Sequence, residues 1–276
     1  MFDTHCHLNF SRFKKNYREV IQSATDAGVT HCMIPGTDLD SSQKAIVIAE
    51  EYHNVYAAVG IHPHHVFELL QKNETTLLDR KIGEIEQLLS HEKVIAIGEV
   101  GLDRHIYENT KYQEYHANET FIDLQKQFLH AQIKLAQQYN KTVILHNREA
   151  TTDLLDILNK NWNEWHHINF VFHCCEPNPE LLSFAVQHSV YIGVDGDITY
   201  QPEKQEFVKN IPLNLLVLET DSPFLLPEPL RSRKEYPNEP KNISVVAEFV
   251  ASILNKTKEE IAEITSINAQ RLFQLK

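Results

Sequence analysis

The chain opens with Met1-Phe2-Asp3-Thr4-His5-Cys6-His7, a short apolar run that ends in two histidines. This pattern predicts a β-strand. Strand side chains alternate between the two faces, so Asp3, His5 and His7 would project to one side. Two imidazoles one step apart on one face can hold a single metal ion. A pair of surface histidines near a frayed terminus has the same spacing, so the rest of the chain must decide between the two readings.

Seven further short apolar runs follow, separated by longer helical ones. The strands that we predict cover residues 2–7, 31–35, 55–61, 94–99, 142–146, 169–173, 190–194 and 215–219. Several of these runs are apolar without alternation, which is typical of parallel strands covered on both faces. Eight strands alternating with helices predict an α/β protein, a (β/α)8 TIM barrel formed by residues 1–276 as one domain. An open doubly wound sheet is the alternative, but no Gly-x-Gly-x-x-Gly or P-loop follows any strand.

Between the strands, the pattern predicts helices at residues 41–53, 112–139, 242–254 and 258–273. Ser41 is the expected N-cap of the first of these. The helix at 112–139 carries an apolar stripe. Its members are Phe121, Leu124, Phe128, Ala131 and Leu135. Residues 226–240 contain four prolines and are expected to form a long ordered loop after the eighth strand.

Composition limits the function classes. The chain has 26 Lys and Arg against 38 Asp and Glu, a net charge of −12. This balance argues against a broad nucleic-acid-coating surface but allows an enzyme that engages one strand end, because bound divalent ions make a site locally positive. Four cysteines without a Cys-x-x-Cys pair are expected to be reduced thiols in a cytoplasmic protein. No signal stretch or membrane span is expected.

Six ionisable side chains stand at the carboxyl ends of five predicted strands. They are His5, His7, Glu99, His146, His173 and Asp221. Active sites of this barrel lie at that end. Each residue alone could be a hydrogen-bonded rim or turn residue, but charges gathered at the rim of a tight barrel cost free energy unless they are paired or bind metal. Nitrogen and carboxylate ligands without thiolates suit Zn²⁺, Mn²⁺ or Mg²⁺. Six ligands exceed the needs of one zinc ion, so we predict two divalent ions that share a bridging carboxylate.

Several motifs occur in one order along nearly the whole chain. They are Phe2-Asp3-Thr4-His5-Cys6-His7-Leu8-Asn9-Phe10, Gly60-Ile61-His62-Pro63-His64, Ile97-Gly98-Glu99-Val100-Gly101-Leu102-Asp103, His146-Asn147-Arg148-Glu149-Ala150, His173, Leu218-Glu219-Thr220-Asp221-Ser222-Pro223, Asn238-Glu239-Pro240 and Asn268-Ala269-Gln270-Arg271-Leu272-Phe273. In these motifs the chain resembles the TatD family of metal-dependent deoxyribonucleases, within the amidohydrolase-like barrels. The resemblance implies that His5, His7, Glu99 and Asp221 hold one ion. It implies that Glu99, His146 and His173 hold the other, with Glu99 as the bridge.

The chain departs from the family pattern at two places. After the strand-six histidine the family usually has Cys-Phe-Ser-Gly, whereas this chain has Cys174-Cys175-Glu176-Pro177-Asn178. The family commonly has tyrosines after the strand-four aspartate, whereas Arg104-His105 follow here. The loop before Asn238 is also longer. These differences concern substrate contacts and leave the expected metal ligands intact.

The expected function is that of a metal-dependent hydrolase, a deoxyribonuclease of the 3′–5′ exonuclease type. It would cleave phosphodiester bonds at a single-stranded DNA end, or in another nucleic acid, with a hydroxide activated by two metals. Asp221 and His62 are the predicted catalytic residues, as proton acceptor and as donor to the leaving group. Arg148 and His64 are the predicted contacts to substrate phosphate. No membrane and no obligate protein partner are expected.

The supporting residues have their own expected roles. Asp3 and Glu219 would orient ligand imidazoles or close pairs in the barrel. Asp103 is expected to be structural. The basic cluster of Arg231, Arg233 and Lys234 is interpreted as a solvated loop that could meet a nucleic-acid backbone.

Two alternatives remain. A metal-dependent deacylase, esterase or amidohydrolase could use the same hydroxide on an acyl ester, such as an aminoacyl-tRNA, or on an amide. The altered segment Cys175–Asn178 keeps this alternative open. A non-enzymatic binding barrel is the other, and the intact set of six ligands argues against it.

Overall fold

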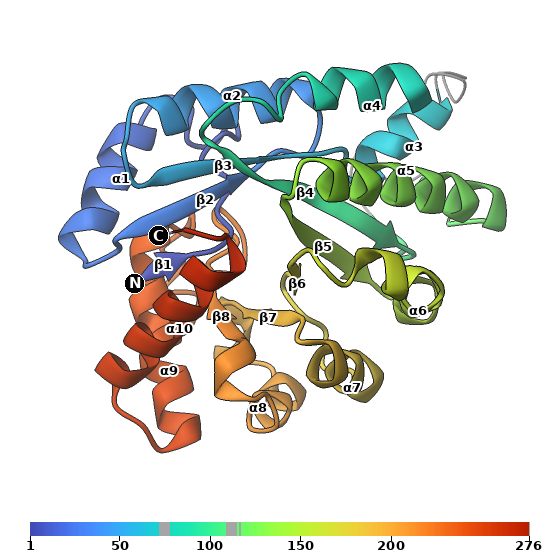
Figure 1. Cartoon of the computed structure of the whole chain (residues 1–276). Helices are drawn as coiled ribbons and strands as arrows, with labels where there is room; N and C mark the ends of the chain where they lie inside the picture. The colour runs from blue at the N-terminus through green and yellow to red at the C-terminus, as the bar shows by residue number, and fades with distance from the viewer. Residues whose placement is uncertain (72–77, 109–114, 116, 276) are drawn as a thin grey trace.

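The computed structural model describes residues 1–71, 78–108, 115 and 117–275. Its centre is an eight-stranded parallel sheet in the order β1 to β8 (Figure 1). The strands are β1 Phe2–Asp3, β2 His31–Pro35, β3 Val55–Val59, β4 Val94–Asp103, β5 Thr142–Arg148, β6 Phe170–Phe172, β7 Tyr191–Val194 and β8 Leu216–Leu218. Every neighbouring pair is parallel, and strands and helices alternate along the chain.

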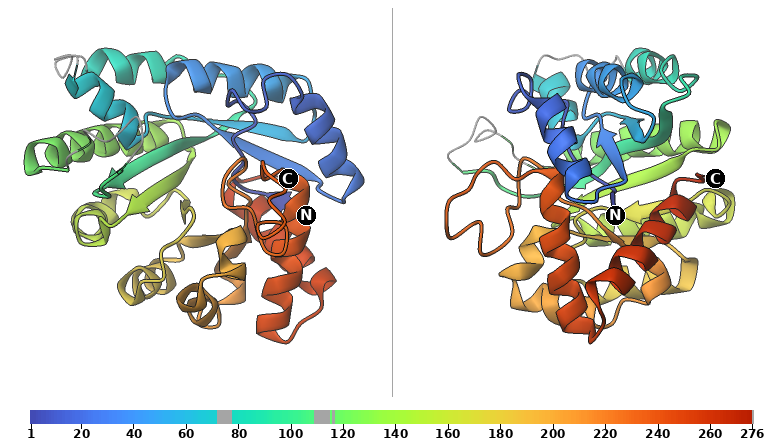
Figure 2. Two further views of the ribbon diagram at one scale, coloured as in Figure 1. Left: turned by 180° about the vertical axis from the view of Figure 1, so that it is seen from behind. Right: turned by 90° about the vertical axis from the view of Figure 1, so that its left-hand side faces the viewer.

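The helices surround the sheet (Figure 2). They are α1 Tyr17–Asp26, α2 Leu39–Glu50, α3 Pro63–Gln71, α4 Leu78–Glu86, α5 Glu119–Gln138, α6 Thr151–Trp165, α7 Pro179–His188, α8 Pro202–Val208, α9 Ile243–Leu254 and α10 Lys258–Leu272. Short 3₁₀ turns lie at η2 Gly196–Thr199, η3 Leu213–Leu215 and η4 Pro240–Asn242. Local caps explain several helix starts: Asn178 accepts from two backbone N–H groups of α7, and Thr257 forms a capping box with Glu260.

The first and last strands meet and nearly close the barrel. The amide of Thr4 donates to the carbonyl of Leu218 (3.1 Å), and the amide of Asp221 donates to the carbonyl of His5 (2.9 Å). Cys6 forms an isolated parallel bridge with Ser222. These contacts confirm the predicted (β/α)8 TIM barrel.

The inside of the barrel is filled by one layer of apolar side chains from seven strands. This layer consists of Phe2, Met33, Ala58, Ala96, Ile144, Val171 and Val217, which pack with Ala269, Leu272 and Phe273 of the C-terminal segment. The end of α10 closes the side where the strands begin, because Thr142 and Asn169 donate to the carbonyl of Leu272. The carboxyl ends of the strands form the other side, which we call the mouth.

Several predicted elements differ from the structure, among them β4, which continues to Asp103 instead of ending at residue 99. The first strand ends at Asp3, because residues 4–7 bond to the ends of β2 and β8 rather than continue a regular ladder. The helix predicted at 41–53 begins at Leu39, with Asp38 and not Ser41 as its N-cap. Asp38 accepts from the Ser41 amide (2.8 Å), while the Ser41 hydroxyl completes a capping box. The helix predicted at 112–139 begins at Glu119 with Asn118 as its cap; residues 112–114 and 116 lie outside the described residues.

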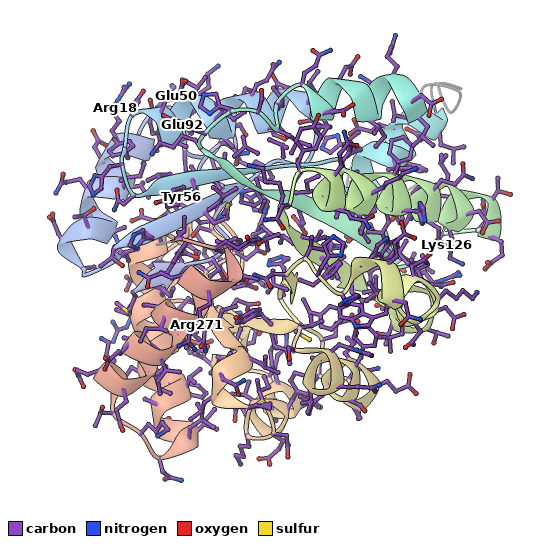
Figure 3. The ribbon with its side chains drawn as sticks, viewed as in Figure 1. Arg18, Glu50, Tyr56, Glu92, Lys126 and Arg271 are labelled. Atoms are coloured by element: carbon purple, nitrogen blue, oxygen red, sulfur yellow. The ribbon has the colours of Figure 1, made fainter. Side chains whose placement is uncertain are left out.

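The outer surface carries paired charges. Arg18 and Lys126 project from outer helices (Figure 3), and they form ion pairs with Glu51 (2.7 Å) and Asp153 (2.6 Å).

The right-hand view of Figure 2 shows the proline-rich segment after β8 projecting as a long loop. No helix among the described residues has the length and apolarity to cross a bilayer. The four cysteines are all described, and each is a free thiol.

Candidate metal centre

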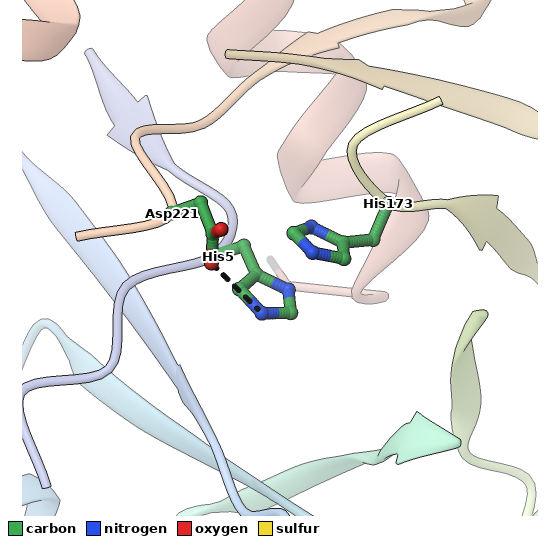
Figure 4. A group of neighbouring side chains, drawn as sticks. All are labelled: His5, His173 and Asp221. Carbon is green, nitrogen blue, oxygen red and sulfur yellow. Dashed lines mark ion pairs between the residues drawn. The ribbon is translucent and has the colours of Figure 1, made fainter. Parts of the chain in front are cut away.

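The six residues predicted as metal ligands come together at the mouth. His146 and His173 follow Ile144 and Val171 by two residues, so strand alternation places them above the apolar layer. His5, Glu99 and His173 are almost completely buried. Asp221 keeps 14% of its side chain exposed and His146 15%, which opens the site to solvent. Figure 4 shows His5, His173 and Asp221 converging from three separate segments of the chain.

The first group of donor atoms has the spacing of ligands around one ion. His5 Nε2 and His7 Nε2 lie 3.1 Å apart, and they lie 3.5 and 3.6 Å from Glu99 Oε2. Asp221 Oδ1 lies 3.8 Å from His5 Nε2 and 3.4 Å from His7 Nε2. Ligand atoms ~2.1 Å from one tetrahedral ion lie ~3.4 Å apart. These four residues therefore fit a divalent metal ion.

A second group gathers at the other oxygen of Glu99. Its Oε1 lies 2.7 Å from His146 Nδ1, 3.5 Å from His62 Nε2 and 3.7 Å from His173 Nε2. The two oxygens of one carboxylate thus face two different sets of histidines. His62 joins this group, although its sequence pattern indicated only a catalytic role beside the ligands.

Glu219 lies behind His173, as expected of an orienting residue. Its Oε1 is 2.9 Å from His173 Nδ1, which leaves Nε2 directed at Glu99. The Cys174 amide also donates to this carboxylate. Gly193 on β7 provides the space, since a Cβ there would lie 2.6 Å from Glu219 Oε2. Asp3 instead accepts from the amide (3.0 Å) and hydroxyl (2.7 Å) of Thr220 and so links β1 to the segment after β8.

Asp103 has a larger part in the site than its sequence position indicated. It is fully buried, and its Oδ2 lies 3.2 Å from His146 Nε2 and 3.3 Å from His64 Nε2. The Tyr107 hydroxyl donates a hydrogen bond to the same oxygen (2.6 Å). A tyrosine therefore contacts this aspartate, although Arg104-His105 directly follow it in place of the tyrosines common in the family. Gly101 allows this close approach of β4 to β5, because a Cβ there would lie 1.8 Å from the His146 carbonyl oxygen.

Burial and neighbouring charges divide the imidazoles into two classes. Burial lowers the pKa of His5 well below its ordinary range, and it lowers the pKa of His62 to about 3 despite the attraction of Glu99. Burial also acts on His146, but its hydrogen bonds with Asp103 and Glu99 outweigh burial and raise its pKa to about 9. Glu219 similarly outweighs burial at His173 and raises its pKa to about 10. Neutral imidazole is the form that binds metal, so protons compete with metal at the last two residues.

The residues predicted to contact substrate lie along the rim. The exposed Arg148 guanidinium lies 5.2 Å from the centre of the Tyr107 ring, with Nη1 3.3 Å from its hydroxyl. His64 is partly exposed (18%) beside Asp103. Arg104 pairs with Asp153 (2.6 Å) and Glu119 (3.0 Å), so its charge is neutralised within the fold. In the long loop, Arg231 pairs with Glu228 (3.4 Å) and Arg233 with Glu235 (3.8 Å).

The atypical segment after His173 is held by its own hydrogen bonds. Glu176 accepts from Asn147 Nδ2 (2.9 Å) and from the Glu149 amide (3.0 Å). It therefore ties the loop after β6 to the loop after β5. Burial raises the pKa of Glu176.

Asp103 and Tyr107 are the site residues whose contacts sequence reasoning missed. Asp103 is four residues beyond Glu99, and only the length of β4, which continues to Asp103, places it at the mouth. A carboxylate at the end of a long strand, with a tyrosine four residues later, is the signal that was available.

Comparisons with known proteins agree with this architecture. The family described as TatD related DNase matches residues 2–274. The uncharacterized metal-dependent hydrolase YabD of Bacillus subtilis is 35% identical over 277 residues, which cover 100% of this chain and 99% of the relative. The 3′-5′ ssDNA/RNA exonuclease TatD of Erwinia tasmaniensis is 33% identical, with 100% of both chains covered. The crystal structure of YjjV, a TatD homolog from Escherichia coli, superposes with a TM-score of 0.84 at 28% identity, covering 100% of this chain and 98% of the other.

The barrel and its relatives define a metal-dependent hydrolase. Within that class, the chain belongs to the TatD-related DNase family, as its motifs predicted.

Proposed function

We propose that this protein is a two-metal 3′–5′ exonuclease that hydrolyses phosphodiester bonds at the end of single-stranded DNA in the cytoplasm. The observation that carries the proposal is the Glu99 carboxylate, whose Oε2 faces His5 and His7 while Oε1 faces His62, His146 and His173. Bridging by one carboxylate is the arrangement of a two-metal site. The printed name of the Erwinia relative, an exonuclease on single-stranded DNA and RNA, supports the substrate class.

Divalent ions held here would lower the pKa of water and neutralise charge on the phosphate and the leaving oxygen. His5, His7, Glu99 and Asp221 would hold one ion. Glu99, His146 and His173 would hold the second. His62 lies beside them, with its Nε2 3.5 Å from Glu99 Oε1.

The chain's own residues would handle protons and orientation. Asp221 is partly exposed beside His7 and accepts the proton of the attacking water. The His64 amide donates to His62 Nδ1 (3.1 Å), which leaves the His62 proton on Nε2 toward Glu99. With its pKa lowered to about 3, His62 is neutral, so its Nε2–H acts as a weak hydrogen-bond donor. Arg148, preoriented against Tyr107, offers its fork to phosphate oxygens, and His64 lies on the same rim.

The surface supports engagement of a strand end rather than wrapping of a duplex. The net charge is −12, and the outer-helix cations Arg18 and Lys126 are paired with carboxylates. Bound divalent ions and Arg148 would supply positive charge at the mouth itself.

The experiment is an activity panel on the purified protein loaded in turn with Mg²⁺, Mn²⁺ and Zn²⁺. With 5′-labelled single-stranded DNA we expect a ladder of products shortened from the 3′ end. Glu99→Ala and His146→Ala should abolish it. Aminoacyl esters and amides form the second arm, because an activated hydroxide also attacks carbonyl carbon. Ester hydrolysis without a DNA signal above the Glu99→Ala background would replace the nuclease proposal with a deacylase.

A further inference from the structure

A half-exposed phenylalanine stands beside the first donor group. Phe224 is 50% exposed, and it follows Asp221 by three residues. Its ring lies 6.3 Å from the His7 ring, centre to centre, at 70°. Half of this large apolar side chain faces water at the mouth, so its free surface is available to an apolar or flat ligand.

Phe10 extends this aromatic surface. Its ring stacks on His7 with centres 4.2 Å apart and planes at 18°. Phe224 meets Phe10 at 6.2 Å and 73°. The two phenylalanines come from the segment after β1 and the segment after β8, and they converge on the same predicted ligand. We call Phe10 and Phe224 the aromatic pair.

The backbone holds Phe224 in place before any ligand binds. The Phe224 amide donates to the Asp221 carbonyl (2.8 Å), and the Asn238 amide donates to the Pro223 carbonyl (3.1 Å). Asp221 itself has φ of +50°, a left-handed conformation that surrounding structure must enforce. An ordered aromatic ring loses little conformational entropy when a flat ligand stacks on it.

We propose that the aromatic pair is a nucleobase-stacking subsite, with Phe224 as its exposed member, for a nucleotide flanking the scissile phosphate. This inference rests on the proposed function, in which the scissile phosphate would lie against the ions, one of them held by His5, His7, Glu99 and Asp221. A base one nucleoside unit away then reaches Phe224, which contacts His7. Stacking suits an exonuclease because every base has a π-face, so successive nucleotides bind regardless of sequence. Stacking also binds a base without a positively charged side chain, so the subsite needs no cation beside Phe224.

The test pairs enzyme variants with base-bearing and abasic ligands. Binding of dAMP and of deoxyribose 5-phosphate to the metal-loaded protein is measured by calorimetry, and KM is measured for oligonucleotides that are intact or abasic at either of the last two 3′ positions. Wild type should prefer the base-bearing ligand by about 5- to 150-fold, the range expected for one stacked base. Phe224→Ala should lose most of that preference, whereas Phe224→Trp should keep it.

Ile267→Ala is the matched control, because it removes an exposed apolar side chain (39%) from α10. The melting temperature of each variant shows any effect on folding, and its metal content shows any effect on the predicted metal-binding residues. The subsite is overturned if Phe224→Ala weakens the binding of base-bearing and abasic ligands equally. It is also overturned if the wild-type protein shows no preference for the base-bearing ligand. A wild-type protein that shows base-dependent binding through Phe224 but cleaves no phosphodiester would refute the proposed function and leave the subsite standing.

Discussion

At the scale of single residues, buried carboxylates orient the imidazoles of the site. Glu219 holds His173 Nδ1 at 2.9 Å, and Asp103 lies 3.2 Å from His146 Nε2. Both carboxylates are completely or almost completely buried, so their charge acts on the imidazoles with little screening by water. Residues of this kind tune ligand basicity as well as ring orientation.

Replacing Glu219 by Gln should therefore weaken metal binding while leaving the predicted ligands in place. We expect a loss of about 10- to 100-fold in metal affinity, the usual cost of removing an orienting carboxylate. A chelator-competition titration measures it. Glu149→Gln is the control, since Glu149 is an exposed rim residue that pairs with His105. Equal affinities for Glu219→Gln and the control would show that Glu219 does not orient a ligand.

The raised pKa of His146 gives the metal-free protein a defined pH dependence. Its pKa is about 9 in the fold against 6.5 for the ordinary group, so the folded state binds the extra proton. That stabilisation is complete below pH 6.5 and disappears as the pH rises through 9. Metal must displace the same proton, so metal affinity should rise over this window. We expect the melting temperature of the chelated protein to fall between these pH values, and to fall less in His146→Ala. A flat profile in wild type would contradict the assignment.

At the scale of elements, the end of β7 depends on a buried charge cluster. Lys204 of α8 is 1% exposed, and its Nζ lies 2.6 Å from Asp197 Oδ1 and 3.3 Å from Asp195 Oδ2. Asp195 caps η2, so the ammonium joins α8 to the turn that follows β7. Burial lowers the pKa of Lys204, but the combined attraction of Asp195 and Asp197 outweighs burial and keeps that pKa well above its usual value.

Lys204→Ala should destabilise the fold by about 3–5 kcal/mol, because it leaves two carboxylates buried without a counter-charge. Urea denaturation measures the change in the free energy of unfolding. The triple variant Lys204→Met, Asp195→Asn, Asp197→Asn removes all three charges and should recover much of the loss. A single variant as stable as wild type would show that the cluster is solvated.

At the scale of the whole molecule, the metal centre joins distant parts of the chain. Its candidate donor residues lie within β4 and β5 or follow β1, β6 and β8. Hydrogen bonds such as those of the Thr4 and Asp221 amides join the segments of β1 and β8. Ions bound at this point would stabilise the closed barrel.

Chelation should therefore lower the melting temperature, and restoring the ion should reverse the change. Binding to the folded state alone contributes about 2.7 kcal/mol at a ligand concentration 100 times Kd. Differential scanning calorimetry with and without chelator tests this, and the variant Glu99→Ala should show a much smaller response. If wild type and Glu99→Ala respond alike, the ion acts elsewhere.

Sequence patterns predicted the barrel, which the structure confirms, and six candidate metal ligands, which the structure brings together. Apolar runs that alternate with helical patterns indicate the (β/α)8 order. The alternation of side chains along each strand places His5, His146 and His173 at the carboxyl end of the barrel. These signals are local, so they can be read along the chain. The short first strand and the Asp38 cap were misjudged because competing hydrogen bonds, not propensity, decide where a strand or helix ends.

The tertiary structure alone decided how these residues combine. Three features depend on contacts between segments far apart in the chain. The two oxygens of Glu99 face different histidines, and Asp103 supports His146. Phe10 and Phe224 meet at His7. Such contacts follow from the packing of the whole barrel and from the room left by Gly101 and Gly193. No periodicity in one segment encodes them, because each distance depends on two backbones that only folding brings together.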